Sequence, residues 1–312
     1  MDSTGMVKNT LLYFAQNRLA NRLARQYGLK LGAQRFVAGT SIDTALQASR
    51  ELNARGMTVT LDHLGESVET VDEAQTATQS CLGVLDAIGQ AGINARLSIK
   101  LTQLGLALDR NLCIANVRTI VEKADRLDSF VRIDMEDFRY NEATIDVYRR
   151  VHRDFPNRVG IVLQASLFKT REDVMTLAQD QANVRLVKGA YRESTSVAWR
   201  DKSKIDANYL DLLRTYLSTG NFTAIATHDE RIIEPIKEFI RSNKIPLDRF
   251  EFQMLYGIRS ELAQRLLREY PVRIYVPFGD DWFAYFMRRL AEHPSNMAFL
   301  LRKEGQNNPK AR

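Results

Sequence analysis

Eight short runs rich in β-branched and aromatic residues, each followed by polar residues or glycine, constrain the fold of this chain most strongly. Their first residues lie 22 to 39 positions apart, which leaves room in every gap for one helix and two loops. This alternation predicts a parallel sheet, and eight units favour an α/β fold closed into a (βα)8 TIM barrel. An open doubly wound sheet is the competing architecture. The expected strands are Met57–Leu64, Arg96–Leu101, Phe130–Glu136, Val159–Ala165, Val184–Ala190, Phe222–His228, Phe250–Leu255 and Val272–Pro277.

The segments between these runs carry apolar residues at the spacing of helices. Asn141 is expected to cap one helix, and Asp280 or Asp281 to cap the last. The sequence TRED from Thr170 has the pattern of a capping box and predicts that a helix begins there. The other expected helices are Asn111–Leu127, Ile205–Leu217, Ile232–Ile240, Ile258–Glu269 and Asp280–Glu292, and the helix capped by Asn141 is expected to run through Val151.

Three regions are expected along the chain. Residues 1–55 form a helical extension, in which Asn9–Gln26 and Ile42–Asn53 are extra N-terminal helices packed on the barrel. Residues 56–303 form the catalytic barrel, and residues 304–312 form a polar tail that is expected to fray. Met6 is an alternative start of the chain.

Composition excludes several classes of protein. Hydrophobic residues make up 45% and charged residues 26%, which rules out disordered and collagen-like chains. The net charge of +6 is modest and includes no dense basic block interleaved with aromatic residues, so we expect no nucleic-acid partner. The chain has no signal-peptide pattern and no apolar stretch near the roughly 18 residues of a membrane span, which favours a cytoplasmic location. Cys81 and Cys113 lie in expected helices outside any CxxC pair, so we expect reduced thiols and no metal site.

Ionisable side chains gather at the carboxyl ends of the expected strands, where barrels of this class carry their active sites. Because residues two apart share a face of a strand, Asp134 lies on the same side as Glu136, and Ser98 on the same side as Lys100. Buried charges are costly unless they are paired, so a functional pocket explains this gathering better than chance. The charged residues at the strand ends are Asp62, Lys100, Asp134, Glu136, Arg185, Lys188, His228 and Asp229.

The expected last helix carries two adjacent arginines, Arg288 and Arg289. Their planar guanidinium groups match the geometry of a carboxylate, so the pair is a candidate carboxylate clamp. A solvated helix face, with Arg288 paired to Glu292 one turn later, is the alternative interpretation.

Nine segments in order resemble flavin-dependent proline dehydrogenase of the monofunctional bacterial type, over roughly residues 37–303. The resemblance implies a distorted (βα)8 barrel that binds FAD without a Rossmann domain. The chain accordingly contains no G-x-G-x-x-G and no G-x-x-x-x-G-K-[ST] sequence. The segments are TLDHLGES, LSIKLTQLGL, IDMED, VLQA, RLVKGAY, ATHD, EFQMLYG, RIYVPFG and YFMRRLAEH.

The resemblance implies an oxidoreductase that converts L-proline to Δ1-pyrroline-5-carboxylate, the first step of proline catabolism. A hydride would pass from the ring carbon beside the nitrogen to N5 of FAD. The electrons would then pass to a membrane quinone, so the protein would be either soluble or in peripheral contact with the inner face of the cell membrane. A pyrroline-5-carboxylate dehydrogenase is the expected downstream partner.

The resemblance also assigns residues to the substrate. Lys100, Arg288 and Arg289 match positions that hold the proline carboxylate. Glu66 matches a residue that pairs with the first arginine and gates the site, and Asp134 matches one that positions the lysine and a tyrosine.

Two further matches concern the proline ring. Leu255 and Tyr275 match residues that pack against it, and the bulk of Tyr275 is expected to crowd a ring hydroxyl, so that proline is preferred to hydroxyproline.

Arg185 matches a position near flavin N5, where its charge would stabilise the reduced flavin, and it is expected to be catalytic together with Lys100. The other expected cofactor contacts are Gln164, Val187, Lys188, Gly189, Ala190, Tyr191, Thr227, His228, Leu255 and Tyr256. The chain departs from the family at His293, where asparagine is common, and the resemblance names no base for the proline amine.

Two other functions remain open from the residues alone. Lys100 or Lys188 on a barrel strand could serve as the amine nucleophile of a Schiff-base aldolase. A basic module that binds nucleic acid is the third hypothesis, and it predicts binding that weakens steeply with salt.

Overall fold

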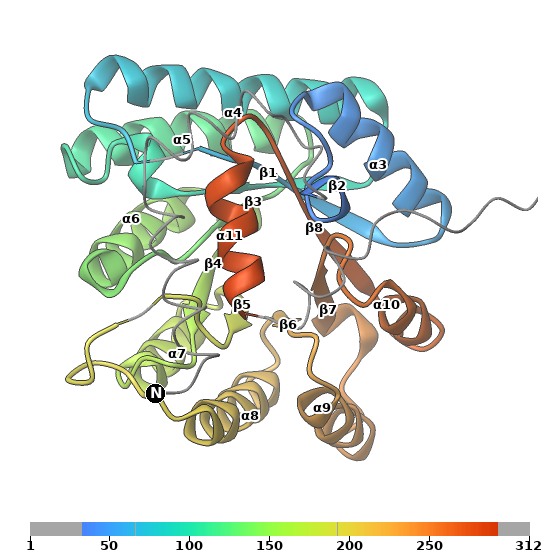
Figure 1. The fold of residues 1–312 in the computed structure, drawn as a ribbon. Helices are drawn as coiled ribbons and strands as arrows, with labels where there is room; N and C mark the ends of the chain where they lie inside the picture. Colours follow the sequence, from blue (N-terminus) through green and yellow to red (C-terminus); the bar gives the residue numbers. More distant parts are fainter. Residues whose placement is uncertain (1–32, 66, 192, 293–312) are drawn as a thin grey trace, which may run out of the picture.

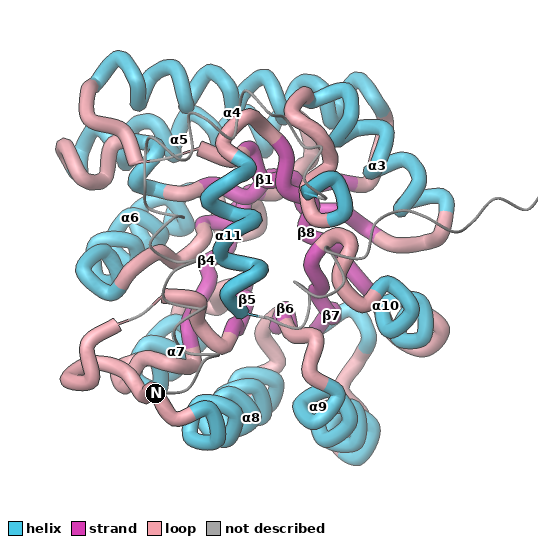
Figure 2. Tube along the Cα trace, viewed as in Figure 1, coloured by secondary structure: helices cyan, strands magenta, loops and turns pink. Residues whose placement is uncertain are grey.

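The computed structural model describes residues 33–65, 67–191 and 193–292, and eight parallel strands within these ranges form a closed barrel (Figure 2). Each strand pairs with the next along the chain, and the last pairs with the first from Thr58 against Arg273 to His63 against Phe278. The predicted (βα)8 barrel is confirmed, and closure excludes the open sheet. The strands are β1 (Thr58–His63), β2 (Ala95–Ile99), β3 (Val131–Ile133), β4 (Val159–Gln164), β5 (Asn183–Val187), β6 (Thr223–Ala226), β7 (Phe250–Leu255) and β8 (Val272–Phe278).

Nine α-helices lie in the described part of the chain, and eight of them follow a strand (Figure 1). The remaining helix, the first of the nine, precedes β1 and corresponds to the predicted Ile42–Asn53 segment. The helices are α3 (Ile42–Ala54), α4 (Val71–Ala91), α5 (Arg110–Arg126), α6 (Asn141–Asp154), α7 (Thr170–Gln179), α8 (Lys202–Ser218), α9 (Glu230–Ser242), α10 (Ser260–Leu267) and α11 (Trp282–Glu292). Four short 3-10 helices accompany them: η2 (Ala33–Arg35), η3 (Leu101–Leu104), η4 (Phe138–Tyr140) and η5 (Leu247–Arg249).

Several strands end earlier than the sequence predicts, so some of the polar residues expected at strand ends lie in the loops that follow. β3 stops at Ile133, so Asp134 and Glu136 belong to the loop that follows it. The backbone N–H of Asp134 still donates to the carbonyl of Ile99 at 2.9 Å, which holds the start of this loop against β2. Lys188 likewise follows the end of β5. Loops anchored in this way can carry ligand-binding groups on a rigid barrel.

Two of the predicted helix caps are wrong. Asn141 and Thr170 are the first residues of their helices, and neither side chain caps the helix. The Thr170 hydroxyl instead donates to the carbonyl of Gln164 at 2.6 Å. A capping box is present at α4, where Thr70 and Glu73 bind each other's backbone N–H groups. In α7 the cap position falls on Lys169, one residue before the predicted cap, so the Thr170 hydroxyl already belongs to the first turn of the helix.

Helix α11 lies across the barrel opening (Figure 1). Its apolar side is anchored by Trp282, which is 1% exposed, and by Phe286. These rings pack against η2 and against Leu64 after β1, in a cluster separate from the main core. Burying one large apolar side chain contributes about 1.5–3 kcal/mol, so this cluster fixes the rotation of α11 about its axis.

Cys81 and Cys113 are buried in α4 and α5, which confirms the helices predicted around them. The described residues contain neither a helix of the length and hydropathy needed to cross a bilayer nor a metal-binding group of His, Cys, Asp and Glu. The predicted helix Asn9–Gln26 and the tail 304–312 lie outside the described residues, and the proposed division into three regions stays a prediction.

Candidate active site

Lys100 is the central cation of the barrel opening, immediately after β2. Its Nζ lies 2.6 Å from Oδ1 of Asp62 in β1 and 3.7 Å from Oδ2 of Asp134. Burial alone would lower the pKa of Lys100, but the two carboxylates outweigh that effect and raise the pKa above its ordinary value. Lys100 is therefore a fixed positive charge, which disfavours its use as the free amine of a Schiff-base enzyme.

Asp134 connects three other strands through its two carboxylate oxygens. Its Oδ1 accepts hydrogen bonds from the Ser98 hydroxyl at 2.9 Å and from Nη1 of Arg185 at 2.8 Å. Its Oδ2 accepts from the Tyr275 hydroxyl at 2.8 Å. The structure thus brings the predicted Asp134 together with both the lysine and the tyrosine expected beside it.

Arg185 is buried in the barrel interior on β5. Its Nε donates to Oε1 of Gln253 at 2.5 Å, while Nη1 is held by Asp134. Its Nη2 is buried without a hydrogen-bond partner among the described residues. The guanidinium carbon also lies 5.3 Å from the centre of the Tyr275 ring, a cation–π contact.

A polar recess lies beside Arg185, at the ends of β4 and β5. The Nε2 group of Gln164 donates to the carbonyl of Glu136 at 2.7 Å, which turns Oε1 of the same amide away from that carbonyl. Oε1 of Gln164 and the hydroxyl of Ser166 are buried with no partner in residues 33–65, 67–191 and 193–292. Gly189 borders both groups at a φ of 113°, and a Cβ there would overlap the Ser166 hydroxyl. Unpartnered buried polar atoms of this kind suit a polar ligand.

Lys188 begins a charged cluster next to this recess. Its Nζ lies 2.5 Å from Asp206 and 2.9 Å from Asp229, and both carboxylates also contact Lys202. Arg231, on α9, forms a 2.9 Å ion pair with Asp229 and holds the pKa of that carboxyl well below its ordinary value. Three cations therefore share two carboxylates, which leaves one net positive charge.

The ends of β6 and β7 are joined by a histidine. Nε2 of His228 accepts a hydrogen bond from the backbone N–H of Leu255 at 2.9 Å, so the ring is unprotonated at that nitrogen. Thr227 accepts from the N–H of Asp229 at 3.1 Å. Both predicted residues therefore hold the local backbone at the ends of these strands.

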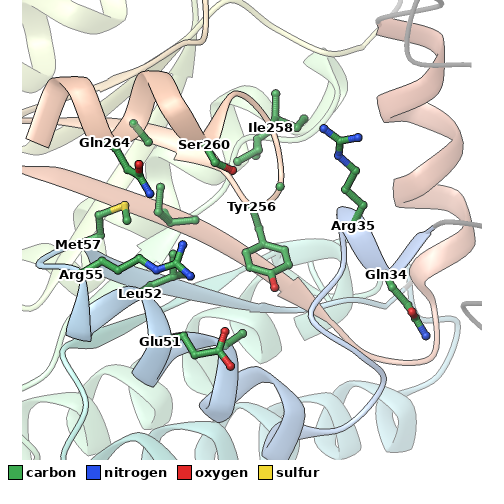
Figure 3. A pocket seen from close by; sticks show the side chains of 15 residues that line it. Gln34, Arg35, Glu51, Leu52, Arg55, Met57, Tyr256, Ile258, Ser260 and Gln264 are labelled. Carbon is green, nitrogen blue, oxygen red and sulfur yellow. The ribbon is translucent and has the colours of Figure 1, made fainter. Parts of the chain in front are cut away.

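Tyr256 belongs to a different space. Its ring projects into a cleft of about 210 Å³ between α3 and α10 (Figure 3). A second cleft of about 390 Å³ adjoins it and shares Tyr256 and Glu51. Leu255 and Tyr256 are the only site residues predicted from the sequence that line the first cleft. The remaining lining residues are Gln34, Arg35, Ala48, Glu51, Leu52, Arg55, Met57, Gly257, Ile258, Ser260, Ala263, Gln264 and Ile274.

The two arginines of α11 are half-buried on the helix that crosses the opening. The guanidinium of Arg289 lies 5.3 Å from the centre of the Tyr285 ring. Partial burial raises the pKa of Tyr191 to about 12, and the charges of Glu136, Arg288 and Lys100 all act on its phenol. The predicted Glu66 lies outside the described residues, and so does the side chain of Glu292, the alternative partner of Arg288.

Sequence reasoning missed Gln253. It is a polar residue inside the otherwise apolar end of β7, two positions before Leu255 and two after Glu251. Strand alternation places these three side chains on one face, so two polar residues on an interior face were the available signal.

Known proteins resemble this chain over most of its length. The family model described as proline dehydrogenase matches residues 45–302. Proline dehydrogenase 1 of Bacillus subtilis (strain 168) is 42% identical over 298 residues, which cover 95% of this chain and 98% of that protein. Proline dehydrogenase of Deinococcus radiodurans is 40% identical over 301 residues, with coverages of 95% and 97%. The crystal structure of proline utilization A from Bdellovibrio bacteriovorus, inactivated by N-propargylglycine, superposes with a TM-score of 0.79 at 26% identity over 88% of this chain and 34% of that chain.

Proposed function

The chain belongs to the proline dehydrogenase family, and from that premise we propose that it oxidises L-proline to Δ1-pyrroline-5-carboxylate with FAD as its resident cofactor. Membership makes it an oxidoreductase of the first step of proline catabolism. The observation that carries the finer proposal is the buried network of Lys100, Asp134, Arg185 and Tyr275 beside a recess of unpartnered polar atoms.

The recess fits the polar edge of a flavin. Gln164 offers an acceptor at Oε1 and Arg185 a donor at Nη2, and Gly189 adds no side chain beside Oε1 of Gln164 and the Ser166 hydroxyl. When bound, FAD would supply the hydride acceptor N5, which no protein side chain can replace. The proposed contacts are Gln164, Arg185, Val187, Lys188, Gly189, Ala190, Tyr191, Thr227, His228 and Leu255. Tyr256 stays in this set only as the neighbour of Leu255, because its ring lines the outer cleft.

The charged cluster around Lys188 is a candidate binding site for the diphosphate of FAD. Lys202 and Arg231 add two cations that were not predicted, and Asp206 and Asp229 hold all three in place. A preorganised group of cations with one surplus charge suits a diphosphate better than scattered surface lysines do.

Lys100, Arg288 and Arg289 are proposed to hold the carboxylate of proline. Lys100 is kept protonated by Asp62 and Asp134, and the adjacent arginines come from α11 on the other side of the opening. Three cations on one carboxylate would orient the ring toward Arg185. Glu66 is proposed to pair with Arg288 and gate this space.

Tyr275 and Leu255 are proposed to pack against the proline ring. The Tyr275 hydroxyl is already committed to Asp134, and burial raises the pKa of this phenol above its ordinary value, so it remains a donor. A ring fixed in this way would leave little room for a hydroxyl on the substrate. Proline would therefore be preferred to hydroxyproline.

Arg185 is proposed to be catalytic through its charge. It is buried, and Asp134 is its only ion-pair partner among the described residues. A preorganised positive charge in a site that excludes water stabilises negative charge that develops beside it.

The electrons are proposed to pass to a membrane quinone, with the chain in the cytoplasm and in peripheral contact with the inner face of the cell membrane. A pyrroline-5-carboxylate dehydrogenase would consume the product. These proposals rest on family membership. Reduction of a water-soluble quinone by the proline-reduced protein would test the acceptor, and co-sedimentation with vesicles made from anionic lipid would test the membrane contact.

The visible spectrum of the purified protein tests the proposed function. We expect the two bands of an oxidised flavin and their loss when L-proline is added without oxygen. A proline analogue with oxygen in place of the ring nitrogen cannot form the C=N bond of the product, and it would serve as a non-reducing control. A colourless protein that stays inert after FAD is added would overturn the flavin proposal.

A further inference from the structure

A line of buried polar side chains leads from the inside of β8 and β7 to the proposed site. Nε of Arg273 donates to Oε1 of Glu251 at 2.8 Å, and Nε2 of Gln253 donates to the same oxygen at 2.6 Å. Nε of Arg185 then donates to Oε1 of Gln253 at 2.5 Å. All four residues are at most 5% exposed, so water does not compete for these bonds.

The order of donors and acceptors fixes the orientation of the Gln253 amide. An ionised Glu251 can only accept, and an arginine can only donate. Burial alone would raise the pKa of Glu251, but Arg273, Arg96 and the hydrogen bond from Gln253 together outweigh burial, and the pKa lies below its ordinary value. The amide nitrogen of Gln253 must therefore face Glu251, and its oxygen must face Arg185. A flipped amide would set oxygen against carboxylate and nitrogen against guanidinium.

This amide holds one edge of the Arg185 guanidinium. Gln253 engages Nε and Asp134 engages Nη1, so two of the three nitrogens of a planar group are fixed. The third nitrogen, Nη2, is buried and has no partner within the described part of the chain. Its direction follows from the other two bonds. Because Gln253 is neutral, it fixes Arg185 without cancelling its charge.

We propose that Gln253 is a positioning residue for the oxidation of proline: it aims Nη2 of Arg185 through a neutral hydrogen bond, and the Glu251–Arg273 ion pair sets the amide that does so. The inference rests on the proposed function, because that function makes Arg185 the charge facing the cofactor. Neither Glu251 nor Arg273 needs to touch substrate in this arrangement.

Two variants separate orientation from charge. Gln253→Met removes both amide bonds at similar volume. The exchange Glu251→Gln with Gln253→Glu allows three bonds between the same neighbours, with the middle bond reversed so that the amide at 251 donates to the carboxylate at 253, and it moves the negative charge next to Arg185. For Gln253→Met we expect kcat to fall about 10- to 100-fold, while KM for proline changes less than about threefold because other cations hold the carboxylate. For the exchange variant we expect a kcat between those of Gln253→Met and the wild-type protein. Its flavin reduction potential should lie below the potentials of both of these proteins, because the exchange brings a negative charge closer to Arg185.

Tyr216→Phe is the matched control. It removes a buried 2.5 Å hydrogen bond to the carbonyl of Ala182, away from the proposed site. Its stability should fall while kcat and the flavin potential stay at wild-type values. This control shows what a buried polar deletion does without displacing Arg185.

Crystal structures provide the readout that does not depend on activity. The Arg185 guanidinium should move or become disordered in Gln253→Met and return to its place in the exchange variant. An Arg185 unmoved in Gln253→Met, or a flavin potential unchanged by the exchange, would overturn the inference. If Gln253→Met does not fold, the exchange variant alone decides by the same two measurements. A wild-type protein that proline does not reduce counts against the proposed function, whereas the position of Arg185 still tests the inference.

Discussion

The hydroxyl of Tyr275 donates a hydrogen bond of 2.8 Å to Oδ2 of Asp134, across the inside of the barrel. β8 and β3 are not neighbours in the sheet, so this bond joins β8 to the loop after β3, two segments that no strand pairing brings together. It places the Tyr275 ring against Arg185 while the other oxygen of Asp134 binds that arginine. One carboxylate thereby sets the position of a ring proposed to face the substrate and of a proposed catalytic cation.

The first prediction separates the ring of Tyr275 from its hydroxyl. Tyr275→Phe should keep the preference for proline over hydroxyproline, because the ring still fills the space, and should lower kcat because Asp134 loses a donor. Tyr275→Ser should narrow that preference by about 10-fold, the effect of about 1.4 kcal/mol. The ratio of kcat/KM for the two substrates is the measurement. Equal ratios in all three proteins would contradict the assignment of the ring.

The second prediction concerns the carboxylate clamp. Arg288→Met should weaken proline binding about 10- to 100-fold, because a hydrogen bond to a charged group is worth about 1.5–3 kcal/mol. The flavin spectrum should remain, since Arg288 is not among the proposed cofactor contacts. The KM for proline, measured in steady-state turnover with an electron acceptor, reports the effect. Arg149→Met, which removes a cation paired with Asp180 on the surface, is the control and should leave KM unchanged.

A third prediction uses three glycines. Gly189→Ala should destabilise the fold by more than about 1 kcal/mol and weaken FAD binding, because φ is 113° and the new Cβ would meet Ser166. Gly220→Ala has a φ of 76° but meets no other described atom within 4 Å, so it measures the backbone strain alone. In Gly83→Ala, within α4, the new Cβ would point into open space, and the variant should stabilise the fold by about 0.5–1 kcal/mol.

Urea unfolding of the three glycine variants gives their free energies of unfolding. The cost at Gly189 should exceed the cost at Gly220, because its φ of 113° lies farther from the left-handed region and its new Cβ overlaps Ser166. Equal costs at the two positions would show that the recess has room for a side chain, and the argument for a close ligand there would fail.

The fourth prediction is the pH dependence of Lys100. Its folded-state pKa is raised above the ordinary value of 10.5, so its contribution to stability is fully present below that pH. The contribution is lost only as pH rises through the higher folded value. Proline binding through Lys100 should therefore not titrate between about pH 6 and pH 10.

Asp62→Asn should change that profile. Burial lowers the pKa of Lys100, and Asp62 is the largest effect opposing it, so removing this charge should bring an alkaline rise of KM into the accessible range. Asp128→Asn is the control, because Asp128 forms an exposed ion pair with Arg158. An alkaline limb that stays in place in Asp62→Asn would show that another group controls proline binding.

Much of the fold could be predicted from the sequence. Strands of a parallel barrel are buried on both faces and therefore appear as short apolar runs, which is why β7 was predicted at its observed bounds. The end of β3 could not be predicted, because Asp134 and Glu136 continue its polar–apolar alternation but leave the sheet. The predicted cap at Thr170 is wrong because the helix begins at that residue and the cap position falls on Lys169.

The sequence by itself determined the alternation of strands and helices, and with it the barrel end at which Lys100, Asp134 and Arg185 gather. Only the tertiary structure decided how these charges are paired. Arg185 and Gln253 are 68 residues apart, and they meet because closure of the barrel brings the insides of β5 and β7 together. Hydrogen bonds act over a few ångströms, whereas sequence pattern reports only which face of a strand a residue occupies.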